Sequence, residues 1–154
     1  MPTYRLMPGH IKEERMREAL RSTGAVEVFH TEELDFIYKL DCIARLKDEP
    51  LTPSVGIQFT GRHCEVKEKP TIQAMRRGAV VNRFLYLRCQ APLTREAGGM
   101  LLALVKLVAS APDSMGIVVA TLCLDHGRHY CLTGVEGLPL HDAHTPKGKD
   151  LTWE

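Results

Sequence analysis

The chain has 154 residues, of which 44% are hydrophobic and 25% charged, and its formal net charge is +1. These values are typical of one globular domain with an ordinary core. The small net charge excludes a long-range attraction of the whole chain to nucleic acid or membrane, although a local basic patch remains compatible with it. We expect residues 1–154 to form a single domain, in which residues 135–154 are an irregular tail rich in glycine and proline.

Cysteine usage and apolar runs predict a soluble, cytoplasmic protein. The five cysteines are an odd number without a Cys-x-x-Cys motif, and most lie in apolar runs. This pattern favours buried thiols in a reducing compartment over a disulfide framework. The first residues lack the features of a signal peptide, and the longest apolar run, residues 100–105, is too short to cross a membrane.

The first half of the chain reads as one helix followed by three strands. Helix-forming charged residues and a short apolar stripe predict a helix over residues 10–23, which ends near Gly24. Residues 25–30 read as a short strand. Residues 35–47 alternate between apolar and polar side chains and predict one long strand. Residues 55–60 read as the next strand, after a loop marked by Pro50 and Pro53.

The second half adds two helices and three strands. We expect a helix over residues 68–81 and a strand over 83–89, so that the strands on either side of this helix run parallel. Residues 94–110, with Thr94 as N-cap, read as an apolar helix, and residues 117–124 and 128–133 as a hairpin. The order predicts an α/β fold with a mixed sheet of five or six strands flanked by helices.

Two neighbouring strands are expected to share a polar face. Because side chains alternate along a strand, Lys39, Asp41 and Arg45 face away from the apolar side of residues 35–47, and Gln58 and Thr60 face away from that of residues 55–60. Pairing of the two strands would bring Asp41 and Gln58 together. The simpler interpretation is a solvated strand face in which Asp41 pairs with Lys39 or Arg45.

The order of helix, acid-bearing strand, Gln-x-Thr strand, helix and strand over residues 10–89 resembles the restriction-endonuclease-like, or PD-(D/E)XK, nuclease fold. In that family an Asp on one strand and a Glu or Gln two residues before a Lys on the next surround a divalent metal. Asp41 and Gln58 match the first two positions. Thr60 departs from the pattern, because the family has Lys there. The resemblance therefore implies either an active nuclease or a degenerate relative that binds without cutting.

The resemblance implies a magnesium or manganese site held by Asp41 and Gln58, with Glu14 or Glu18 as a further ligand from the first helix. Hard oxygen ligands suit such ions, which activate water and stabilise charge on a phosphate. A cation near the attacking water would assist, and Thr60 cannot supply it. Lys39, two residues before Asp41, is the candidate replacement. We therefore expect Asp41, Gln58 and Lys39 to be catalytic and DNA to be a possible substrate.

Two further groups of residues are weighed against plainer interpretations. Lys69, Arg76 and Arg77 would lie on the helix after the metal-binding strand and would contact phosphate, unless they form an ordinary solvated helix face. The histidines of the C-terminal part match no standard zinc spacing, and we expect no metal to be bound by them together; they are His126, His129, His141 and His144.

The alternative function is self-association without catalysis. The helix at 94–110 has apolar residues on most of its surface, so one face can cover the sheet while the other forms a homodimer. On this interpretation the protein is a scaffold that uses its sheet and this helix. Clustering of Asp41, Gln58 and Glu14 or Glu18 around a cleft would favour the enzyme, and their dispersal would favour the scaffold.

Overall fold

A computed structural model describes residues 8–61, 65–78, 81–90, 93–125 and 129–139. These residues form a six-stranded sheet in which the strands follow chain order, β1 to β6. The strands are Val26–Phe29, Cys42–Leu46, Val55–Thr60, Phe84–Cys89, Ile117–Asp125 and His129–Leu138. The β3, β4 and β5 strands run parallel, and all other neighbours are antiparallel. The predicted α/β class with a mixed sheet is confirmed.

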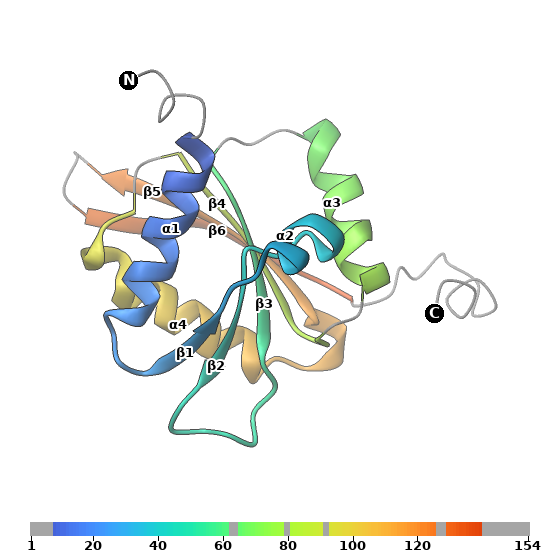
Figure 1. Cartoon of the computed structure of the whole chain (residues 1–154), viewed down its shortest axis with the longest axis horizontal. Coiled ribbons are helices and arrows are strands. Elements are labelled where there is room, and N and C mark those ends of the chain that lie inside the picture. The colour runs from blue at the N-terminus through green and yellow to red at the C-terminus, as the bar shows by residue number, and fades with distance from the viewer. Residues whose placement is uncertain (1–7, 62–64, 79–80, 91–92, 126–128, 140–154) are drawn as a thin grey trace.

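Four α-helices cover the two faces of this sheet: α1 (Pro8–Arg21), α2 (Glu32–Tyr38), α3 (Glu65–Gly78) and α4 (Gly98–Ala109). One apolar core joins α1 and α4 to one face, and a second, smaller core joins α2 and α3 to the other. Figure 1 shows the twisted sheet between the two pairs of helices. In the part of the chain that the structure describes, no helix is long and apolar enough to cross a membrane.

The predicted strand over residues 35–47 is wrong in its first half. Residues 32–38 form α2, and β2 begins only at Cys42. Thr31 caps the helix by accepting a hydrogen bond from the backbone N–H of Leu34, and three acidic residues in the first turn favour a helix start. Lys39 ends the helix in the left-handed region, with φ 58°. It therefore does not share a strand face with Asp41.

The other predicted elements are confirmed with shifted ends. The α3 helix begins at Glu65 and includes Pro70, so it starts and ends three residues earlier than predicted. Thr94 does cap a helix start, but the first turn is a 3-10 helix, Arg95–Ala97, and α4 follows it. The β6 strand extends to Leu138, so residues 135–138 are not part of an irregular tail. Residues 140–154 lie outside the described residues.

The α4 helix is used mainly as a core helix. Its buried residues include Leu101, Leu104, Val105 and Val108, which pack in the larger core with α1 and the sheet. Leu107 is the large apolar residue of α4 that is clearly exposed, at 42%. The exposed side of α4 also includes Ala103 and Lys106, and the homodimer stays a prediction.

Candidate metal centre

Asp41 lies where β2 begins and β3 ends, and it continues the pairing of these two strands. Its backbone N–H donates to Ile57 O at 2.7 Å, and its carboxylate Oδ2 accepts the backbone N–H of Phe59 at 2.5 Å. These two hydrogen bonds lie on either side of Gln58 in the β3 sequence. The predicted proximity of Asp41 and Gln58 therefore follows from strand pairing.

Three carboxyl groups from three elements converge at this end of the sheet. Glu13 comes from α1, Asp35 from α2 and Asp41 from the residue before β2, and one oxygen of each lies within 4.8 Å of the others. Asp41 is fully buried, and the other two are half-buried. Among the described residues this is the group of acidic, histidine or cysteine side chains close enough to share a cation. We call these three residues the acidic cluster.

Burial makes the negative charge of Asp41 costly. Desolvation, followed by the negative charge of Glu13, raises the pKa of Asp41 well above its usual range. Asp35 adds to the rise, whereas the hydrogen bond from Phe59 and the charge of Arg17 oppose it. A cation placed among the three carboxylates would offset their mutual repulsion and favour the ionised form of Asp41.

Two oxygen atoms at this end of the sheet are buried and have no hydrogen-bond partner in the protein: Oδ1 of Asp41 and Oε1 of Gln58. Buried oxygens of this kind are rare without a partner, a water or an ion. Carboxylate and amide oxygens are hard ligands that magnesium and manganese prefer. The three carboxyl groups therefore fit the divalent cation that the sequence resemblance implies, and the unpartnered oxygen of Gln58 lies on the strand that pairs with Asp41.

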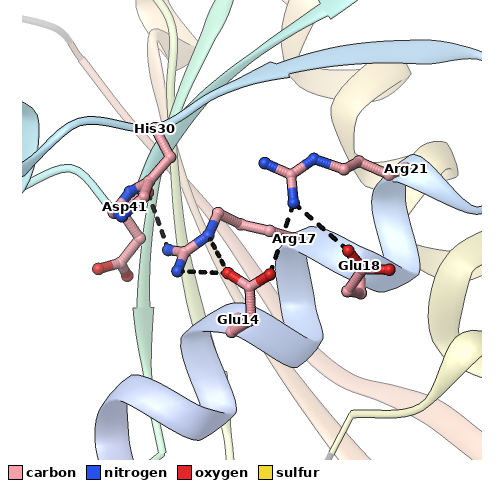
Figure 2. Close-up of polar contacts among 6 residues, drawn as sticks. All are labelled: Glu14, Arg17, Glu18, Arg21, His30 and Asp41. Atoms are coloured by element: carbon pink, nitrogen blue, oxygen red, sulfur yellow. Dashed lines mark hydrogen bonds and ion pairs between the residues drawn. The ribbon is translucent and has the colours of Figure 1, made fainter.

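Arg17 anchors the site without neutralising it. The guanidinium group is buried and donates to the backbone O of Asp41 at 3.2 Å, and His30 Nδ1 lies 2.9 Å from the same oxygen. Figure 2 shows that Arg17 reaches the backbone of Asp41, while the remaining nitrogens of its guanidinium bind Glu14. Arg17 thus joins α1 to the start of β2 and leaves the carboxyl group of Asp41 available.

Glu14 and Glu18, the predicted helical ligands, do not belong to the acidic cluster. Glu14 forms ion pairs with Arg17 at 2.8 Å and Arg21 at 3.6 Å, and Glu18 pairs with Arg21 at 3.5 Å (Figure 2). The helix turns the neighbouring Glu13 towards Asp41 instead. The acid of α1 that lies near Asp41 is therefore Glu13, and not Glu14 or Glu18, which the sequence resemblance implied.

The remaining predicted residues are dispersed. Lys39 is exposed at the end of α2. Lys69 and Arg77 are exposed on α3. Arg76 donates to Pro139 O, just after the end of β6. Leu138 pairs with Ile117, the first residue of β5. Arg76 therefore lies at the end of the sheet opposite to the end where Asp41 lies. The structure does not bring Arg76 to the acidic cluster.

The structure describes only some residues of the histidine-rich end. Cys123 is exposed and Cys131 is half-buried, so the expected burial of the thiols does not extend to Cys123. His129 is exposed on β6, and the side chains of the other three histidines lie outside the described residues.

Sequence reasoning missed Glu13 and Asp35. The signal for Asp35 was the run Thr31-Glu32-Glu33, an N-cap followed by acids, which is typical of a helix start and places Asp35 on a helix. No comparable signal distinguishes Glu13 from Glu14. No family model, curated protein or solved structure matches the chain. Its function therefore has to be inferred from the residues of the site itself.

Proposed function

We propose that this protein processes nucleic acid with a divalent cation held by the acidic cluster and Gln58, as a nuclease or as a relative that binds without cutting. The observation that carries the proposal is the convergence of Glu13, Asp35 and Asp41, with the buried Oδ1 of Asp41 unpartnered. Magnesium or manganese bound there would activate water and stabilise charge on a phosphate.

The arrangement of the elements supports the nuclease interpretation. The elements follow the order of the restriction-endonuclease-like fold that the sequence resembles. This order is α1, Asp41 directly before β2, Gln58 on β3, α3 and β4. The additional helix α2 interrupts that order and contributes Asp35. Within this proposal Asp41 and Glu13 provide negative charge, Gln58 a neutral carbonyl oxygen, and Arg17 fixes the backbone of Asp41.

The uncharged Thr60 bears on whether the protein cleaves nucleic acid or only binds it. A nuclease needs a fixed cation beside the reacting phosphate, and Thr60 carries no charge. Lys39 is retained as a candidate for this role, because it is exposed at the end of the helix that carries Asp35. If no lysine takes this role, the protein binds the cation and nucleic acid without cleavage.

The first test measures cation binding and compares two adjacent acids of α1, one inside the acidic cluster and one outside it. We expect magnesium or manganese to raise the melting temperature of the wild type, because a ligand that binds only the folded state stabilises it. Glu13→Gln and Asp41→Ala should lose this response. Glu14→Gln is the matched control, because Glu14 is bound to Arg17 outside the acidic cluster, and it should keep the response. No response in the wild type would contradict the proposed cation site.

The second test measures cleavage of single-stranded and duplex DNA with each metal. Asp41→Ala should abolish cleavage, Gln58→Ala should reduce it less, and Lys39→Ala should reduce it if Lys39 provides the cation. Thr60→Lys should increase cleavage if a missing charge limits the rate. Absence of both cleavage and metal-dependent binding, in the wild type and in Thr60→Lys, would exclude the proposed function.

A further inference from the structure

A cavity of about 510 Å³ opens at the same end of the sheet as the acidic cluster. Its walls are the last residues of β4 and β5, from Arg88 to Gln90 and from Thr121 to Leu124. The carboxyl ends of parallel strands are the common place for ligands in open α/β sheets. The volume lies within the range of roughly 300–1,000 Å³ that is usual for small-ligand sites.

The β3 strand and α1 link the cavity to the acidic cluster. Thr60, at the end of β3, pairs with Arg88, which pairs with Thr121 on β5. Neighbouring strands lie about 4.8 Å apart, so the cavity begins one strand beyond the residues that hold Asp41. Lys12, which precedes Glu13 on α1, donates from Nζ to Gln90 O at 3.3 Å. Consecutive residues of α1 thus reach the cluster and the wall of the cavity.

Among the described residues that line the cavity, the charges nearly cancel. Arg88 is a half-buried cation, but Glu68 neutralises it through a hydrogen bond from Nε to Oε2 at 2.7 Å, and Nη1 donates to Thr121 Oγ1 at 3.2 Å. Leu122, Leu124 and the thiol of Cys123 add apolar surface. Such walls suit a flat, uncharged heterocycle with polar edges better than a free phosphate. The ammonium group of Lys12 at the rim suits a phosphate.

We propose that this cavity holds one unpaired base of a single-stranded nucleic acid and that Lys12 contacts the adjoining phosphate. The proposal rests on the proposed function and names its substrate class. Proteins that recognise single strands hold bases that have left the stack and bind the edges of those bases by hydrogen bonds. A base in a duplex would first have to leave its stack, which costs a few kcal/mol. The net charge of +1 gives no broad electrostatic attraction to a duplex.

The test measures the affinity for fluorescently labelled oligonucleotides in the presence of a chelator, so that neither metal binding nor cleavage contributes. Short homopolymers of DNA and RNA are compared with a duplex of equal length. We expect the wild type to bind single strands more tightly than the duplex. Cys123 lines the cavity from an exposed position, so the indole of Cys123→Trp should occupy the volume that a base would fill and weaken single-strand binding until the preference over the duplex is lost.

Two matched variants provide the controls. Leu107→Trp adds the same ring at an exposed position on α4 and should bind as the wild type does. Lys12→Ala should weaken binding of all sequences and reduce the slope of log affinity against log salt concentration by about one, as expected for one lost phosphate contact. Lys106→Ala, an exposed lysine on α4, should leave this slope unchanged.

Preference for the duplex, or equal binding by Cys123→Trp and the wild type, would overturn the proposal. The melting temperatures of the same variants with magnesium separate the two proposals. A cation response in Cys123→Trp with unchanged nucleic-acid affinity would reject the base site and keep the metal centre. Single-strand binding that Cys123→Trp weakens, in a protein without any cation response, would reject the metal centre and keep the base site.

Discussion

At the scale of single residues, burial of the Asp41 carboxyl group lowers the stability of the fold, but it places this acid where a cation could bind. Its carboxyl group accepts one backbone hydrogen bond, leaves one oxygen unpartnered, and lies near two other acids. An isolated strand end would be more stable with a neutral side chain in this place. An acid in such an environment is typical of a functional site, where pKa values are often perturbed.

We therefore predict that Asp41→Asn stabilises the protein at neutral pH when no divalent cation is present. A carboxyl group whose pKa is raised by burial and by Glu13 binds its proton more tightly in the folded chain. The stability that it contributes is present below the unfolded pKa and is lost as the pH rises through the folded pKa. The neutral amide avoids this loss. Thermal unfolding should show a higher melting temperature for the variant at neutral pH and a smaller difference in acid.

Magnesium should reverse the order of the two proteins, because it stabilises the wild type and not the variant. Glu14→Gln serves as the control, since Glu14 is exposed and outside the acidic cluster. If Asp41→Asn were less stable than the wild type in the absence of cations, Asp41 would be stabilised as an anion by its neighbours. The interpretation of the cluster as a site that needs a cation would then be wrong.

At the scale of elements, the short helix α2 brings Asp35 into the acidic cluster. The helix has only seven residues and begins with the cap that Thr31 provides. A helix of this length is marginal without its cap and its packing against α3. The position of Asp35 therefore depends on one hydroxyl group outside the site.

Thr31→Ala should lower stability by about 0.5–2 kcal/mol, the usual cost of losing an N-cap. It should also weaken the cation response, because the first turn that carries Asp35 is less well fixed. Thr31→Ser keeps the hydroxyl group and should restore both properties. Chemical denaturation with and without manganese measures the two effects. A full cation response in Thr31→Ala would contradict the dependence of the Asp35 position on the helix cap.

The packing of α1 on α4 depends on one of two adjacent glycines. A Cβ atom at Gly98 would lie 2.7 Å from the backbone O of Ala19 on α1, whereas a Cβ atom at Gly99 would have open space around it. Gly98→Ala should destabilise the protein by about 1–3 kcal/mol, because the two helices must move apart. Gly99→Ala should be neutral or stabilise it by up to roughly 0.5–1 kcal/mol. Denaturant unfolding of both variants compares them directly, and equal effects would contradict this packing.

At the scale of the whole molecule, strand alternation and helix spacing predicted most elements and the fold class, because both depend on local sequence. Residues 35–41 were predicted as a strand because Phe36, Tyr38 and Leu40 occupy alternate positions, although Thr31 and the acids after it favour a helix. The strand order and the approach of Glu13 to Asp41 depend on tertiary packing. No local pattern contains that information, so the acidic cluster was predicted only in part.

The two cores on either side of the sheet should unfold together. Leu87 and Phe84 are fully buried on the same strand, but Leu87 packs in the core with α1 and α4 and Phe84 in the core with α2 and α3. Because β4 is shared, loss of either core removes the support of the other. Leu87→Ala should cost about 2–5 kcal/mol and Phe84→Ala about 3–5 kcal/mol, each in one transition. Far-ultraviolet circular dichroism and tyrosine fluorescence should give the same midpoint for each variant. Two separate midpoints in Phe84→Ala would mean that α2 and α3, and with them Asp35, detach while the rest of the sheet stays folded.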